Sequence, residues 1–170
     1  MSRWLAFLPL ALLAGLGLLF ALYALGRDPQ VKPEALVGKP VPAVALAPLG
    51  DGVAAPLAAD RSPHLINLFA SWCGPCEIEH PQLMRLKRQG VRITGVAYKD
   101  EPAKARAFLQ RLGNPFTTIV VDPDGRAGVE FGVSGVPETF AVAGGVIVAK
   151  HTGPLTPEAA DRLASRLRAR

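Results

Sequence analysis

The fold of this chain is decided by the stretch Leu65-Ile66-Asn67-Leu68-Phe69-Ala70-Ser71-Trp72-Cys73-Gly74-Pro75-Cys76. Its first six residues form an apolar run that is typical of a strand, and the run leads directly to two cysteines. From residue 75 to 89 the spacing becomes helical, with Ile78, Leu83 and Leu86 expected on one apolar side. We therefore predict a strand that feeds a helix, with the cysteine pair at the junction.

Patterns downstream of the cysteines predict further strands and helices. Asp100 is expected to cap a helix with Pro102 in its first turn, and Gly113 is expected to end it. Further strands are expected at 41–46, 91–98, 117–121, 138–143 and 146–150, and a last helix opens at Thr156-Pro157-Glu158. Strand-helix-strand units require parallel pairing, whereas a hairpin at Gly144-Gly145 requires antiparallel pairing. The sequence thus predicts an α/β fold with a mixed central sheet flanked by helices.

An uncharged apolar segment opens the chain. It runs from Trp4 to Leu25, a length that can span a bilayer as a helix. A cleavable signal peptide is the alternative, but its apolar region is usually shorter and ends in a small-x-small site. We predict a transmembrane anchor at residues 4–25 with the amino terminus inside, a proline-rich linker at 26–35 and one folded domain at 36–170.

Charge does not indicate a nucleic-acid partner. Outside the apolar segment and its flanking Arg3 and Arg27, the chain holds 17 basic and 14 acidic residues, a net charge of +3 without a dominant block. Basic residues near the carboxyl terminus suit the last turns of a solvated helix. We expect a monomer that binds no nucleic acid.

Cys73 and Cys76 are the only cysteines, and their separation is too short to stabilise a fold usefully. Such a pair suits a reversible disulfide. Cys73 stands where unpaired backbone N–H groups and the helix dipole favour a thiolate, so it is predicted to be the attacking nucleophile. Cys76, one turn further, is predicted to resolve the mixed disulfide. Pro75 suits a first helical turn and Trp72 offers an apolar surface, although both could be merely structural.

A metal site is the rival interpretation of the cysteine pair. A closed zinc site needs four ligands, and the sequence has no second cysteine pair. His64, His80 and His151 show no ligand spacing with the cysteines. His80 could share a helix face with Cys76 as a copper ligand, but a surface histidine is the simpler interpretation. We expect no metal and no cofactor other than the disulfide.

Several motifs resemble a known family. The run Ala70 to Cys76, with Pro81 five residues later, resembles the active site of the thioredoxin superfamily and implies its fold. Other motifs are similar to the TlpA/ResA/CcmG (DsbE) branch, and to CcmG/DsbE above all: Gly38-Lys39-Pro40-Val41-Pro42, Glu79-His80-Pro81, Tyr98-Lys99-Asp100 and Gly135-Val136-Pro137-Glu138-Thr139-Phe140. The chain departs from that branch at Phe69, at Ala43-Val44 and in the Gly74-Pro75 dipeptide, which leaves substrate choice open.

The resemblance implies roles for residues beyond the cysteines. It implies a cis bond before Pro137, which would leave the backbone of Val136 as an edge that pairs with a substrate, with Trp72 beside it. It also implies that Glu79 and Glu138 are acidic groups that modulate the thiols, with ordinary solvated charges as the alternative.

The same resemblance implies a function. CcmG/DsbE proteins, which the chain resembles most, reduce cysteines during cytochrome c maturation. We therefore expect apocytochrome c or a CcmH-like thiol protein as substrate, a DsbD/CcdA-like membrane electron donor, and a single-pass inner-membrane protein with its carboxy-terminal domain in the periplasm. Three alternatives stay open: a general TlpA-like reductase, a disulfide-forming oxidase, and a metal or haem chaperone that is not an enzyme.

Overall fold

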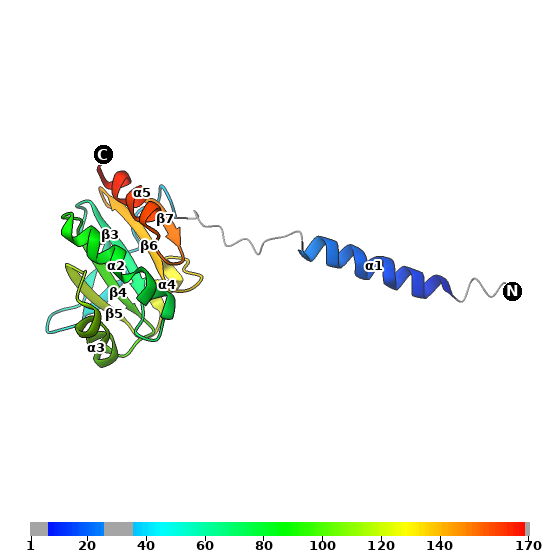
Figure 1. Cartoon of the computed structure of the whole chain (residues 1–170), viewed down its shortest axis with the longest axis horizontal. Helices are drawn as coiled ribbons and strands as arrows, with labels where there is room; N and C mark the ends of the chain where they lie inside the picture. Colours follow the sequence, from blue (N-terminus) through cyan, green and yellow to red (C-terminus); the bar gives the residue numbers. More distant parts are fainter. Residues whose placement is uncertain (1–6, 26–35, 169–170) are drawn as a thin grey trace. The chain divides into compact units, whose positions relative to one another are not determined.

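The computed structural model of the chain describes residues 7–25 and 36–168 (Figure 1). The chain divides into two units, residues 1–32 and 33–170, which are described separately. In the first unit, helix α1 spans Leu8–Leu25, within the predicted anchor. Within the described ranges, no helix combines the length and the apolar character that crossing a membrane requires. Residues 4–6 of the predicted anchor and the predicted linker 26–35 lie outside the described residues.

The second unit is built on a seven-stranded sheet with the order β2-β1-β5-β4-β3-β6-β7. The strands are β1 Ala45–Pro48, β2 Ala55–Pro56, β3 His64–Phe69, β4 Ile93–Tyr98, β5 Thr118–Asp122, β6 Glu138–Ala143 and β7 Val146–Thr152. Strands β3, β4 and β5 pair in parallel, and all other neighbours pair antiparallel. This arrangement confirms the predicted mixed sheet. The first predicted strand is displaced: β1 begins at Ala45, while Val41 donates its N–H to Gly145 beside the hairpin.

Helices cover both faces of the sheet. The helices of this unit are α2 Gly74–Arg88, α3 Pro102–Leu112, α4 Arg126–Glu130, α5 Pro157–Arg168 and the 3₁₀ turn η2 Leu57–Ala59. Apolar side chains of α2, α3 and α5 pack with Leu65 and Phe69 in one core cluster. Ala127 of α4 packs with Ile66 and Leu68 in a second cluster, so alternate residues of β3 serve the two faces. The short helix α4 follows the Asp122–Gly125 turn and was not predicted.

Two local predictions are wrong. Ile78 does not join Leu83 and Leu86 in the core, because its side chain is 73% exposed on the outer side of α2. The buried face of the first two turns of α2 is instead formed by Cys76, Glu79 and His80. Asp100 is not the N-cap of α3; that position is Glu101, and the Asp100 carboxylate faces the loop before the cysteines.

The sheet register brings the predicted site residues to one end of the domain. Parallel strands β3 and β4 end side by side, with Phe69 opposite Ala97. Strand β6 is antiparallel to β3 and therefore begins at the same end, with Glu138 opposite Leu68. The loop after β3, the end of β4 and the start of β6 consequently meet at the amino terminus of α2 (Figure 1).

Candidate redox site

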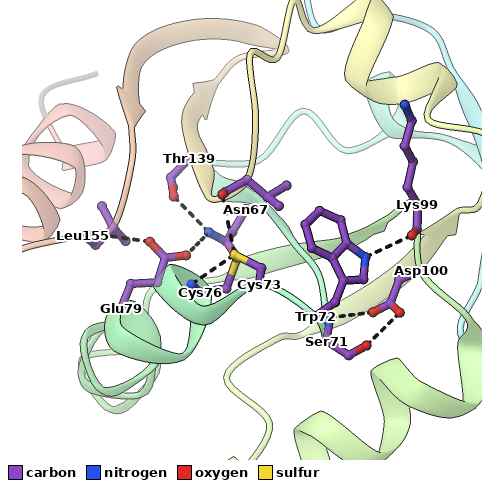
Figure 2. The surroundings of a disulfide bond; sticks show 11 residues. Asn67, Ser71, Trp72, Cys73, Cys76, Glu79, Lys99, Asp100, Thr139 and Leu155 are labelled. Atoms are coloured by element: carbon purple, nitrogen blue, oxygen red, sulfur yellow. Dashed lines mark hydrogen bonds between the residues drawn. A yellow bond between two sulfur atoms is a disulfide. The ribbon is translucent and has the colours of Figure 1, made fainter.

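A disulfide joins Cys73 and Cys76 at the amino terminus of α2 (Figure 2). Cys73 is the N-cap residue, and its Sγ accepts a hydrogen bond from the backbone N–H of Cys76 at 3.1 Å. Gly74 and Pro75 form the first turn, where the missing N–H of a proline costs nothing. Unpaired N–H groups and the helix dipole favour negative charge here, so a thiolate at Cys73 would be stabilised.

The loop that carries Cys73 is held by the end of β4. Asp100 accepts hydrogen bonds from the backbone N–H of Ser71 at 2.6 Å and from the Ser71 hydroxyl at 2.8 Å. The indole N–H of Trp72 donates to the carbonyl of Lys99 at 3.1 Å, while the Trp72 side chain stays 61% exposed. Figure 2 shows both contacts beside the disulfide. They fix the approach to Cys73 and leave an apolar surface open next to it.

Glu79 lies one helical turn after Cys76 and is fully buried. The side-chain N–H₂ of Asn67 donates to Glu79 Oε1 at 2.8 Å, and the backbone N–H of Leu155 donates to Oε2 at 2.9 Å (Figure 2). Burial raises the pKa of Glu79 from 4.5 to about 7, while the hydrogen bonds from Asn67 and Leu155 act in the lowering direction. Asn67 also donates to the Thr139 hydroxyl at 3.0 Å. Glu79 is thus not a solvated helix charge, and it can exchange a proton near neutral pH.

Glu138 is also buried, but its partners differ. Its Oε1 accepts hydrogen bonds from the backbone N–H of Ser134 at 3.0 Å and from the Ser134 hydroxyl at 2.7 Å. Its Oε2 receives no hydrogen bond of regular geometry and instead lies 2.7 Å from the ammonium of Lys150. The charge of Glu138 is therefore compensated within the fold, unlike that of Glu79.

The segment before Glu138 faces the disulfide. The Val136–Pro137 peptide bond is cis, and the carbonyl oxygen of Val136 lies 3.5 Å from Cys73 Sγ. Val136 is half-buried and Pro137 is buried. The predicted substrate-binding residues Trp72, Val136 and Pro137 thus border the disulfide from two different loops.

Some contributors to this site were missed in the sequence. Asn67 could have been found, because it is the one polar residue in the apolar run 65–70. Nothing in the sequence pointed to Lys150, since a lysine in a hairpin strand is ordinarily solvated. His80 was expected on a helix surface, but it is buried and its Nε2 pairs with the carbonyl of Gly113 at 2.9 Å.

Metal-binding residues do not gather in the part of the chain that the structure describes. Within residues 7–25 and 36–168, no group of three or more histidine, cysteine or acidic side chains could hold a metal ion. His80 is directed toward α3 rather than toward a shared ligand site with Cys76.

Comparisons with known proteins agree with thiol chemistry at the Cys73–Cys76 pair. The Redoxin family model matches residues 36–165. The thiol:disulfide interchange protein HelX of Rhodobacter capsulatus is 44% identical over 165 residues, which cover 93% of this chain and 92% of that protein. The thiol:disulfide interchange protein DsbE of Escherichia coli is 41% identical over 152 residues, covering 87% of this chain and 82% of that protein. A thio-disulfide isomerase from Thermus thermophilus superposes with a TM-score of 0.60 at 27% identity, covering 75% and 94% of the two chains.

Proposed function

Because this chain belongs to the Redoxin family and is a thiol:disulfide oxidoreductase of the DsbE/HelX type, we propose that it reduces disulfides for cytochrome c maturation. The observation that carries the proposal is the single Cys73–Cys76 disulfide at the start of α2, beside the buried carboxyl of Glu79. The substrate would be the Cys-x-x-Cys-His segment of apocytochrome c, or a CcmH-like partner that relays electrons to it. Haem is attached covalently only to free thiols, and an oxidising compartment tends to close such pairs into disulfides.

The proposed reaction begins with the reduced protein. The Cys73 thiolate attacks one sulfur of the substrate disulfide, and the other substrate sulfur leaves as a thiolate. Cys76 then gives its proton to Glu79 and attacks Cys73 Sγ. The second substrate sulfur leaves as a thiolate, and Glu79 returns the proton to it. Two electrons have moved to the substrate and the Cys73–Cys76 disulfide is restored. A DsbD/CcdA-like membrane donor would reduce it again, so no bound cofactor is needed.

Substrate binding in this proposal uses the rim of the disulfide. The exposed Trp72 supplies an apolar contact, and the backbone of Val136 beside Pro137 supplies a pairing edge for an extended chain. Gly74 and Pro75 lie exposed between the two cysteines and allow the substrate backbone to approach.

The proposal also places the protein in the inner membrane, with residues 4–25 as a single-pass anchor and the domain in the periplasm. Support comes from the uncharged Trp4–Leu25 segment, which is long enough to span a bilayer, and from helix α1, which lies within it.

Reduction is favoured over the alternatives by a specific feature. The Gly74-Pro75 dipeptide resembles that of reducing thioredoxins, whose potential is about −270 mV, rather than that of a strong oxidant at about −120 mV. A general TlpA-like reductase, an oxidase, and a metal or haem chaperone are the outcomes that the experiment below separates.

We expect deletion of the gene to abolish c-type cytochromes and added small thiol reductant to restore them. The full-length gene should complement, whereas Cys73→Ser and Cys76→Ser should not. Cys76→Ser should accumulate mixed disulfides with its substrate, because the attacking thiol is present and the resolving thiol is absent.

The trapped partners identify the role. Partners that carry Cys-x-x-Cys-His or serve its reduction support the proposal. Normal cytochrome c in the deletion strain would indicate a general reductase, and loss of disulfides in partner proteins would indicate an oxidase. Trapping by Cys73→Ser instead of Cys76→Ser would reverse the assignment of the two thiols. Stoichiometric metal or haem in the purified full chain would indicate a chaperone.

A further inference from the structure

A buried ion pair lies behind the segment that faces the disulfide. The side chains of Lys150 and Glu138 are 4% and 0% exposed, and the Lys150 Nζ lies 2.7 Å from Glu138 Oε2. In the β6–β7 register Phe140 is opposite Lys150 and Glu138 is opposite Thr152, so the two charged residues are diagonal neighbours on one face. Burying two charges is costly, and replacing such a pair by apolar residues is often neutral or stabilising. The pair therefore calls for an explanation other than stability.

Both partners of the ion pair also hold the loop 132–137, which leads from α4 to β6. Glu138 accepts both hydrogen bonds of Ser134, and Lys150 donates to the carbonyl of Gly132 at 3.4 Å. Ser134 and Gly135 are exposed, whereas Val133 and Val136 on either side of them pack against the core. The exposed middle of the loop is therefore the part that these polar contacts hold.

The held loop ends at the disulfide. Val136 follows Gly135 directly, and its carbonyl oxygen stands 3.5 Å from Cys73 Sγ. A shift of the loop would move this carbonyl, and with it the backbone edge that a polypeptide substrate would pair with. A small disulfide compound makes no such pairing and needs only the sulfur atoms.

We infer that Lys150 is a positioning residue: through its ion pair with Glu138 it fixes the loop 132–137, so that the Val136 backbone receives polypeptide substrates. This inference rests on the proposed disulfide-exchange function. It assigns Glu138 to the binding of substrate chains rather than to proton transfer, which leaves Glu79 as the acid that serves the thiols. Lys150 touches neither substrate nor the sulfur atoms in this role.

The test compares two substrates with the purified full chain in detergent. One is a peptide that carries an oxidised Cys-x-x-Cys-His segment, and the other is the small aromatic disulfide dithiobis(nitrobenzoate). Starting from the reduced protein, Lys150→Met should lower the single-turnover rate constant for the peptide about tenfold, mainly through weaker peptide binding, because a misplaced binding edge weakens association. The rate with the small disulfide should stay within about twofold of wild type, since the cysteines are untouched.

Matched variants separate positioning from general damage. Lys150→Arg should retain peptide reduction. The double variant Lys150→Met/Glu138→Gln should still reduce the peptide poorly, because it leaves no buried charge unpaired but lacks the ion pair that holds the loop. Lys104→Met is the control, since Lys104 forms an exposed ion pair with Glu101 at 2.6 Å and should change neither rate. If Lys150→Met does not fold, the exposed Ser134→Ala, which removes one loop contact, should still show a selective loss of about threefold with the peptide.

Two outcomes would overturn the inference. One is an equal loss with both substrates in a folded variant, which would mean that Lys150 supports the thiols themselves. The other is unchanged peptide kinetics in both Lys150→Met and Ser134→Ala. If wild type reduces the small disulfide but not the peptide, the proposed function fails instead, and the two failures are thereby distinguished.

Discussion

Glu79 has an environment that differs sharply from that of a surface carboxylate. It is fully buried, it accepts hydrogen bonds from Asn67 and Leu155, and its pKa is raised from 4.5 to about 7. Both of its oxygens face donors, which suits the carboxylate, whereas burial favours the protonated form. The effect of burial on the pKa of Glu79 is the larger of the two. At neutral pH both protonation states are populated, which is the condition for accepting and returning a proton at Cys76.

The raised pKa of Glu79 predicts how stability depends on pH. The folded protein keeps a proton that the unfolded chain releases, so the stabilisation from this group is full below pH 4.5 and is lost as pH rises through about 7. Glu79→Gln stays neutral throughout. Its free energy of unfolding, relative to wild type, should therefore increase by about 3 kcal/mol from acidic to mildly alkaline pH. Denaturant unfolding of the oxidised protein at several pH values measures this.

The control for Glu79 is its neighbour Glu77, which is exposed and paired with Arg111, so that its pKa lies below 4.5. Glu77→Gln should show no such trend between pH 4.5 and about 7. The pH dependence of Cys76 alkylation in the reduced protein should shift in Glu79→Gln but not in Glu77→Gln. Identical pH profiles for Glu79→Gln and wild type would leave Glu79 with a packing role only.

At the scale of the elements, the junction of β4 with α3 holds the loop that precedes the cysteines. Asp100 accepts three hydrogen bonds, two from Ser71 and one from the backbone N–H of Glu101 at 2.9 Å. It thereby ties the loop after β3 to the loop after β4 and bonds only one N–H at the start of its own helix. The amino terminus of α2 is held in place by a contact between two parallel strand ends.

Removing the hydrogen bonds of Asp100 should lower the stability of the whole domain. Asp100→Ala should lower the free energy of unfolding by about 2–4 kcal/mol, because three hydrogen bonds are lost and the half-buried Ser71 N–H is left without its acceptor. Ser71→Ala removes only the hydroxyl bond and should cost about 1 kcal/mol. Urea unfolding of the oxidised proteins gives both values. A loss in Asp100→Ala no greater than in Ser71→Ala would show that the backbone contact contributes little.

At the scale of the whole molecule, the redox site and the apolar segment belong to different units. Every group of the described redox site belongs to the unit 33–170, and the apolar segment belongs to the unit 1–32. A protein composed of residues 33–170 and exported by an unrelated signal should therefore be released with the soluble periplasmic fraction. With the small disulfide it should react at the rate of the full chain.

The full chain should stay with membranes after a high-salt wash, because apolar anchoring does not depend on ionic contacts. Sequencing the amino terminus of the mature protein completes the test. A terminus near residue 25 in a membrane-free extract would replace the anchor with a cleaved signal peptide. Slower reaction of residues 33–170 with the small disulfide would mean that the first unit contributes to the site.

The sequence by itself determined the strand-helix junction at Cys73, the mixed sheet and the thiol:disulfide chemistry of the cysteine pair. These depend on local periodicity and on a two-residue spacing, which any segment carries within itself. Only the tertiary structure decided the surroundings of the two acidic residues. Glu79 is bonded to Asn67 and to Leu155, 12 and 76 residues away, and Glu138 is paired with Lys150 across a hairpin. Such partners meet through the sheet order, which places β3 between β4 and β6. The sequence therefore left open whether these carboxylates are buried or solvated, because burial depends on which elements cover them.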